Sequence, residues 1–83
     1  MARYLIIERF DSRNLDAIYR RLNEKGRGLP DGLHFVDSWL TATNDCVYQI
    51  METDDESLFE TWFAWWDDLI EFEMSLLREK PEN

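Results

Sequence analysis

The sequence has only one cysteine, Cys46, and one histidine, His34, among its 83 residues. A lone cysteine cannot close an intramolecular disulfide, which excludes a disulfide framework and favours a reducing, cytoplasmic location. A lone histidine supplies too few ligands for a typical metal site, because zinc sites use three or four side chains. We therefore expect neither a metal nor a cofactor.

Long apolar segments are also missing. The N-terminal run Tyr4-Leu5-Ile6-Ile7 is bounded by Arg3 and Glu8. It is too short for the core of a signal peptide or for the roughly 20 residues of a membrane-spanning helix. The sequence shows no internal linker, repeat or low-complexity segment. We expect a soluble protein without a membrane partner, built as one domain, residues 1–78, with a flexible C-terminal tail, residues 79–83.

Basic residues are scarce in the second half of the chain. Residues 1–42 contain seven basic and six acidic side chains, whereas residues 43–83 contain two basic and twelve acidic ones, and the net charge is −9. Nucleic-acid binding depends on Lys and Arg side chains that neutralise phosphates, so this distribution argues against a nucleic-acid partner. We interpret the acidic surplus as a solvated surface.

The residue pattern predicts four strands and two helices. Asp11 or Ser12 caps the first helix, which ends before Gly26, and residues 53–56 match a capping box ahead of the second. An unbroken apolar run is typical of a central strand, and the alternation after Asp68 is typical of a half-buried one. The predicted strands span residues 2–10, 33–41, 46–52 and 71–76, and the helices run to residue 25 and from 58 to 70.

The second predicted helix is unusually rich in large apolar side chains. At 100° per residue, eight of them fall in one arc of roughly 160°, which is typical of a buried helix. Trp65 lies at the edge of this arc, so we expect it to be partly exposed. Asp67 and Asp68 near the end of the helix oppose its dipole, which indicates either a functional site or ion pairs with Arg20, Arg21 or Arg27 of a second subunit.

The order β-α-β-β-α-β is that of the ferredoxin-like, or split βαβ, arrangement, an α+β fold with a four-stranded antiparallel sheet. Right-handed crossovers place both helices on one face of the sheet. The strands carry large apolar side chains on both sides, so the helix-free face stays apolar. A chain of this length also buries little surface by itself. We therefore expect a homodimer that joins the two helix-free faces into a barrel.

Five segments resemble the bacterial domain-of-unknown-function family three-three-zero-three, and together they span nearly the whole chain. The resemblance implies the dimeric α/β-barrel superfamily, which includes cofactor-free monooxygenases and haem binders, and it brings no catalytic residues. Where such domains continue into a Pro-Val segment, this chain has Met74-Ser75-Leu76-Leu77. The segments are Ile7-Glu8-Arg9-Phe10, Leu29-Pro30-Asp31-Gly32-Leu33, Val36-Asp37-Ser38-Trp39, Gln49-Ile50-Met51-Glu52 and Trp66-Asp67-Asp68-Leu69-Ile70-Glu71-Phe72-Glu73.

The candidate ligand contacts are residues expected inside the barrel. If Leu5, Ile7, Phe72 and Met74 face the helices, Glu8 and Glu73 line the dimer-facing side, and a carboxyl group among aromatic rings can act as a general acid or base. The register of the hairpin leaves two alternatives, in which either Gln49 or Tyr48 with Ile50 completes this lining. The six candidates are Glu8, His34, Trp39, Tyr48, Gln49 and Glu73.

Three other residues have simpler interpretations. A single histidine serves as axial ligand in haem-binding relatives of this fold, yet His34 is typical of a polar surface residue. Cys46 lies too far from His34 along the hairpin for a nucleophile pair, and we interpret it as a small buried apolar residue. Arg27 follows a helix and so lacks the context of a phosphate-binding loop. It is able to bind an anion or a carboxylate, but we interpret this loop as a helix end.

These observations favour a homodimeric barrel that binds a small organic ligand, with acid–base or cofactor-free oxidative chemistry. The alternative is a structural or protein-interaction module with a filled barrel and no catalytic activity. A cavity of at least ~300 Å³ lined by Glu8, Trp39 and Glu73 favours the first interpretation, and a packed interior favours the second.

Overall fold

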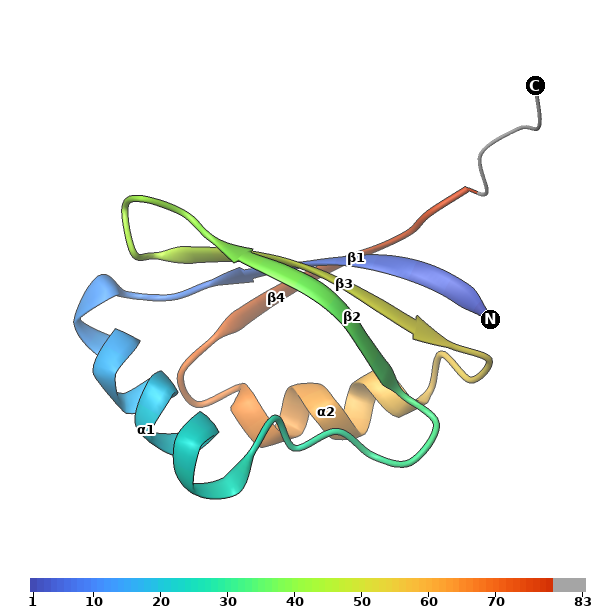
Figure 1. Cartoon of the computed structure of the whole chain (residues 1–83), viewed down its shortest axis with the longest axis horizontal. Coiled ribbons are helices and arrows are strands. Elements are labelled where there is room, and N and C mark those ends of the chain that lie inside the picture. Colours follow the sequence, from blue (N-terminus) through green and yellow to red (C-terminus); the bar gives the residue numbers. More distant parts are fainter. Residues whose placement is uncertain (79–83) are drawn as a thin grey trace.

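The computed structural model describes residues 1–78, and the tail expected at residues 79–83 lies outside the described residues. The strands form one antiparallel sheet in the order β2-β3-β1-β4. Both helices lie on one face of this sheet (Figure 1), so the expected ferredoxin-like fold is confirmed. The elements are β1 (Ala2–Arg9), the 3₁₀ helix η1 (Ser12–Asn14), α1 (Leu15–Lys25), β2 (His34–Leu40), β3 (Cys46–Thr53), α2 (Leu58–Trp66) and β4 (Glu71–Leu76). None of the helices in this part of the chain has the length and apolar character to cross a membrane.

The helix α2 supplies the largest side chains of the hydrophobic core. Phe59, Trp62 and Trp66 are buried on its sheet-facing side, and the Phe59 ring packs edge-on against Tyr4 of β1, with ring centroids 4.9 Å apart. Edge-to-face aromatic packing of this kind adds to the gain from burial itself. Trp65 is 41% exposed, in agreement with its predicted place at the edge of the apolar arc.

The ends of the helices agree only in part with the predicted caps. The Asp11 carboxylate accepts a hydrogen bond from the backbone N–H of Arg13 at 2.9 Å, as a capping residue does. The predicted capping box at residues 53–56 is wrong, because Thr53 is the last residue of β3 and its hydroxyl accepts from the N–H of Asp55. The helix α2 therefore begins at Leu58, and it ends at residue 66, ahead of the predicted residue 70.

The sequence leaves open which side of β1 faces the helices. The candidate site depends on the condition that Leu5 and Ile7 share the helix side with Phe72 and Met74, and this condition is not met. In the structure Glu8 lies directly opposite Phe72, so the even-numbered residues of β1 face the helices and the odd-numbered ones face away. Because β1 is apolar on both sides, its sequence carries no alternation that distinguishes the faces.

A β-bulge in β2 settles the register of the hairpin. The pairing with β3 shifts between Phe35 and Asp37, which leaves Val36 as an extra residue. Beyond the bulge, Trp39 lies opposite Tyr48 on the helix-free face. An extra residue in one strand reverses the sides of all residues that follow it. Of the two alternatives for the hairpin, the one in which Tyr48 and Ile50 lie on the helix-free face is therefore correct, and Gln49 faces the helices.

Arg21 connects α1 to the end of α2. Its guanidinium donates hydrogen bonds to both carboxylate oxygens of Asp68, at 2.8 and 2.7 Å, and to the backbone carbonyl of Trp65 at 2.9 Å. These hydrogen bonds hold the pKa of the Asp68 carboxyl below its ordinary value. The ion pair that we expected between subunits for this aspartate therefore forms within one chain, while Asp67 is exposed.

We expect Gly28→Ala to destabilise the fold more than Gly26→Ala. Both glycines have a φ of +72°, a backbone conformation that an alanine rarely adopts. A Cβ atom at Gly28 would lie 2.5 Å from Nε1 of Trp65, whereas nothing lies within 4 Å at Gly26. Urea unfolding should therefore show an additional loss of about 1–3 kcal/mol for Gly28→Ala. Equal unfolding free energies for the two variants would contradict the close contact with Trp65.

Candidate functional site

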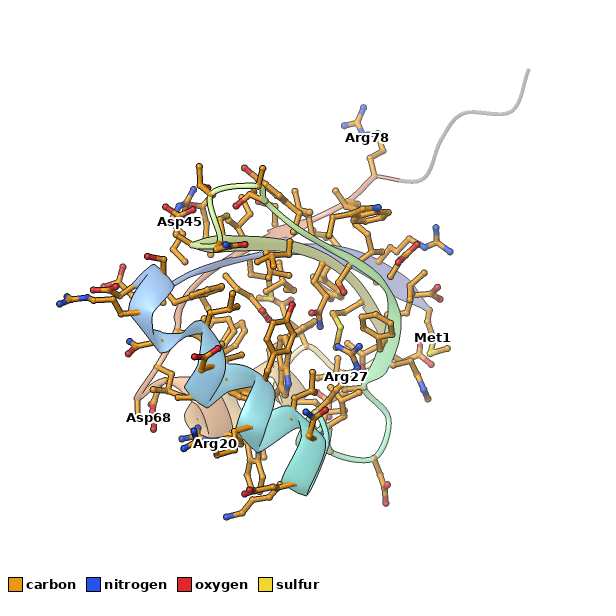
Figure 2. All side chains as sticks on the ribbon, turned by 60° about the vertical axis from the view of Figure 1, so that its left-hand side comes forward. Met1, Arg20, Arg27, Asp45, Asp68 and Arg78 are labelled. Carbon is orange, nitrogen blue, oxygen red and sulfur yellow. The ribbon has the colours of Figure 1, made fainter. Side chains whose placement is uncertain are left out.

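A cavity of about 270 Å³ separates α1 from the sheet. The helix α1 has no fully buried residue, because its apolar side chains roof this cavity and do not pack tightly on the strands. Figure 2 shows α1 in the foreground below the sheet, with side chains in the layer between them. The lining residues are Glu8, Phe10, Leu15, Ile18, Tyr19, Leu22, Arg27, Ser38, Leu40, Val47, Gln49, Trp62, Trp66 and Ile70.

Glu8 is the buried acid of this cavity. It lies on the central strand β1 between Val47 and Phe72 of the neighbouring strands and is only 8% exposed. Burial raises the pKa of the Glu8 carboxyl to about 7, and the positive charge of Arg27 partly opposes this rise. Within residues 1–78, the Glu8 carboxyl makes no side-chain hydrogen bond and no ion pair. A carboxyl group in this setting exchanges its proton near neutral pH.

Gln49 and Ser38 bring further polar groups to the sheet side of the cavity. Gln49 is 3% exposed, lies opposite Ile6 of β1, and its amide donates to the Met51 sulfur at 2.9 Å. Ser38 pairs with Gln49 across the hairpin, so both side chains point to the helices. Together with Glu8 they give an otherwise apolar cavity polar groups on three adjacent strands.

Arg27 lines the cavity from the loop after α1. Its backbone carbonyl accepts hydrogen bonds from the indole N–H groups of Trp62 at 3.0 Å and Trp66 at 2.8 Å. Its guanidinium carbon lies 3.6 Å from the centroid of the Phe35 ring. The loop after α1 is therefore anchored to α2 through its backbone and to β2 through its side chain.

The six predicted ligand contacts divide between two faces of the sheet. Glu8 and Gln49 line the cavity, whereas Trp39 and Tyr48 lie side by side on the helix-free face, 55% and 41% exposed. Glu73 also lies on the helix-free face, where Arg9 donates to it at 2.9 Å. The expected combination of Glu8 with Glu73 in one site is therefore wrong.

His34 and Cys46 lie at opposite ends of the β2–β3 hairpin. His34 is exposed and pairs with Glu52, and Cys46 is partly buried beside Arg9. The predicted separation of the two side chains is confirmed. Within the described residues, no group of three or more His, Cys, Asp or Glu side chains is arranged to hold a metal ion.

Ser38 and the apolar residues of α1 were not predicted as part of the site, and Arg27 was interpreted as part of a helix end. A usable signal was present, because Glu8, Ser38 and Gln49 are polar residues within strands that otherwise point apolar side chains to the helices. Polar groups at inward strand positions indicate a cavity when the core supplies no partner for them.

A second hollow of about 410 Å³ lies where the end of β1 meets the segment after α2. It is more open to solvent than the first. Two of its acids are already paired, Asp68 with Arg21 and Asp11 with Arg13. We therefore place the candidate site in the cavity under α1.

The fold and the cavity define a class of protein: a ferredoxin-like α+β domain with a ligand-sized space between its first helix and its sheet. The chain belongs to the family described as Domain of unknown function (DUF3303), whose model matches residues 2–78. The resemblance found in the sequence is thereby confirmed.

Two solved structures share the fold. A crystal structure of an antibiotic biosynthesis monooxygenase has 18% sequence identity and a TM-score of 0.63, and the match covers 98% of this chain and 100% of that one. Protein Atu4242 from Agrobacterium tumefaciens has 12% identity and a TM-score of 0.62, with 96% of this chain and 94% of that one covered. At these identities the similarity establishes the fold alone. No curated protein matches the sequence.

We expect Glu8→Gln to stabilise the protein at neutral and alkaline pH. The unfolded chain loses the Glu8 proton near pH 4.5, whereas the folded chain keeps it to about pH 7. The free energy of unfolding therefore falls as the pH rises through this range, by up to about 3 kcal/mol for this group. Urea unfolding should give equal free energies of unfolding for wild type and Glu8→Gln at the acidic end of this pH range. At about pH 8 the variant should have the larger free energy of unfolding.

The matched control for this experiment is Glu73→Gln, which removes an exposed carboxylate from the other face of the sheet. It should show no stabilisation at about pH 8. A constant difference between wild type and Glu8→Gln over the whole range would contradict the raised pKa of Glu8.

Proposed function

We propose that this domain binds a small organic molecule in the cavity under α1 and that Glu8 exchanges a proton with it. One observation carries the proposal: Glu8 is a buried carboxyl group that lines a mainly apolar cavity and has a pKa of about 7. An acid–base catalyst works best when its pKa lies near the operating pH, and buried carboxyl groups of this kind gather at functional sites.

The size of the cavity favours a small ligand. Its volume of about 270 Å³ lies just below the roughly 300–1,000 Å³ of typical ligand pockets. The sequence-based criterion for a ligand site was a cavity of at least ~300 Å³ lined by Glu8, Trp39 and Glu73. The observed volume lies just below this value, and the lining contains Glu8 but not Trp39 or Glu73. The proposal therefore places the ligand between helix and sheet within one subunit, whereas the sequence analysis placed it between two sheets.

The reaction class that we propose is removal of a proton from a carbon or hydroxyl group of the ligand. Ionised Glu8 accepts this proton, and the ligand is left as an electron-rich anion. We include cofactor-free oxidation of a carbanion of this kind, because one structure with the same fold is described as an antibiotic biosynthesis monooxygenase. The carbanion adds dioxygen, the peroxide takes the proton back from Glu8, and the hydroperoxide breaks its O–O bond with loss of water to leave a carbonyl group, so dioxygen is the oxidant and one of its atoms enters the ligand. No residue besides Glu8 is assigned to this chemistry.

We expect 2-naphthol, a small neutral aromatic probe, to bind in the cavity. NMR titration of the labelled protein should shift signals of Glu8, Ile18 and Gln49. Leu22→Trp should weaken binding by about tenfold or more, because the larger side chain fills the cavity. Asn23→Trp places the same ring on the exposed side of α1 and should leave binding unchanged.

The same titration tests the alternative function. In a protein-interaction module the signals that move would lie on the helix-free face around Trp39 and Tyr48, and Leu22→Trp would bind the probe as wild type does. Either result would overturn the ligand proposal. The exposed aromatic side chains on that face are the specific observation that favours the module.

We also propose that two copies pair through the helix-free face of the sheet. This face carries the exposed side chains of Trp39 and Tyr48 and the half-buried side chains of Leu5, Ile7 and Ile50. Figure 1 shows both helices on the other side of the sheet. An apolar patch of this kind marks an interface, and a second sheet packed face to face covers it. A cytoplasmic location remains part of the proposal, on the strength of the one free cysteine.

We expect Trp39→Glu to convert this dimer into a less stable monomer, because it places a charge on the apolar face, beside Tyr48. Sedimentation velocity measures the change directly. Trp65→Glu is the matched control, since it removes another exposed indole from the helix side of the molecule and should leave the dimer intact. An unchanged dimer for Trp39→Glu would contradict the proposed interface.

A further inference from the structure

The loop Gly26-Arg27-Gly28 holds Arg27 in a defined position at the cavity. Two indole N–H groups of α2 donate to the Arg27 carbonyl, and the Trp65 ring lies against Gly28. Both hydrogen bonds satisfy buried indole groups, so moving the loop would leave two donors without a partner. The backbone that carries Arg27 is therefore fixed before any ligand arrives.

The side chain of Arg27 differs from those of the arginines that form ion pairs. Arg3, Arg9, Arg13 and Arg21 each form an ion pair with a carboxylate. Within residues 1–78, the guanidinium of Arg27 makes no ion pair and no side-chain hydrogen bond, although it is half-buried at the cavity. Its flat face stacks on the Phe35 ring, which leaves the N–H groups on its edge as donors.

Arg27 and Glu8 lie in the same cavity without contacting each other. The positive charge of Arg27 lowers the pKa of Glu8, yet the two side chains lie beyond the 4.0 Å limit of an ion pair. Because both groups line one space, a ligand that fills it reaches both. The cavity thus has a fixed positive charge at one place and a proton-exchanging group at another.

We propose that the ligand of this cavity is a small organic anion, an aromatic or branched carboxylate, whose charged group binds Arg27 while its apolar body lies under α1. This inference rests on the proposed function and specifies its substrate class. A guanidinium binds a carboxylate through two parallel hydrogen bonds, and the aliphatic and indole side chains of Ile18, Leu22 and Trp66 enclose an apolar body.

The charge of the cavity makes this binding depend on pH. Three titratable side chains line it: Glu8 from β1, Tyr19 from α1 and Arg27 from the loop after α1, while β2, β3 and α2 contribute none. Below pH 7 Glu8 is neutral and Arg27 alone carries charge. Above pH 7 ionised Glu8 repels an anion and competes for the field of Arg27. The affinity for an anion should therefore fall as the pH rises through this value.

The test compares phenylacetate with phenylacetamide, its uncharged isostere, by NMR titration of the full chain. At about pH 6 we expect phenylacetate to bind about tenfold tighter, and at about pH 8.5 we expect most of this preference to be lost. Glu8→Gln should keep the preference at both pH values. Arg27→Met, which retains an unbranched apolar stem but not the charged guanidinium, should abolish it.

Arg20→Met is the matched control for the change of charge. Arg20 is exposed on the outer side of α1, and Figure 2 shows it away from the cavity. This variant should bind phenylacetate as wild type does. If it loses affinity as Arg27→Met does, general surface charge attracts the anion and the inference is wrong.

The outcomes separate this inference from the proposed function. Equal binding of phenylacetate and phenylacetamide, with both displaced by 2-naphthol, overturns the anion class but keeps the ligand cavity. Failure of all three probes to bind overturns both. The pH dependence of wild type and of Glu8→Gln does not require Arg27→Met to fold, so the inference can be rejected even if that variant is unstable.

Discussion

The unequal packing of the two helices determines the character of this domain. The fully buried core contains side chains from the strands, from α2 and from the segments around them, but none from α1. Because α2 carries the large aromatic rings, it fills the space against the middle of the sheet without help. The helix α1 is held by Arg21, which binds Asp68 just after α2 and lies over the Trp66 ring. This division of roles leaves a space under α1 that a fully packed ferredoxin-like domain would lack.

The position of Glu8 shows a conflict between stability and chemistry. A charged side chain is unfavourable when it is buried on an inner strand of a sheet. Burial of the Glu8 side chain raises its pKa to about 7. The structure provides no partner for this group within residues 1–78, whereas four arginines elsewhere are paired with acids. An apolar residue at position 8 would give a more stable domain. Local rules broken in this way are typical of functional sites.

Much of the fold could be predicted from the sequence because its signals are local. The Asp11 cap, the helix end at Gly26 and the exposed edge at Trp65 each depend on a few neighbouring residues. The alternation of β4 also predicts its sides correctly, since Phe72 faces the core and Glu73 faces away. The family resemblance extended these local signals to the whole chain.

The candidate site could not be predicted to the same degree, because it depends on which way two strands face. In β1 both sets of side chains are apolar, and in the hairpin the bulge at Val36 shifts the pairing by one residue. Each feature exchanges the two faces of a strand. The facing of β1 separates Glu8 from Glu73, which were expected together, and the bulge sets which side of the sheet Trp39 faces. The alternation of side chains in the sequence does not predict the bulge.

The two indole rings that share the Arg27 carbonyl also line the cavity, and a third indole lies over the adjacent glycine. Two of the four tryptophans of the chain, Trp62 and Trp66, therefore line one small volume. The domain contains its own fluorescent reporter, because any molecule that enters this volume changes the polarity next to these rings. Compounds from a metabolite extract can thus be screened against the unlabelled protein through its tryptophan emission alone.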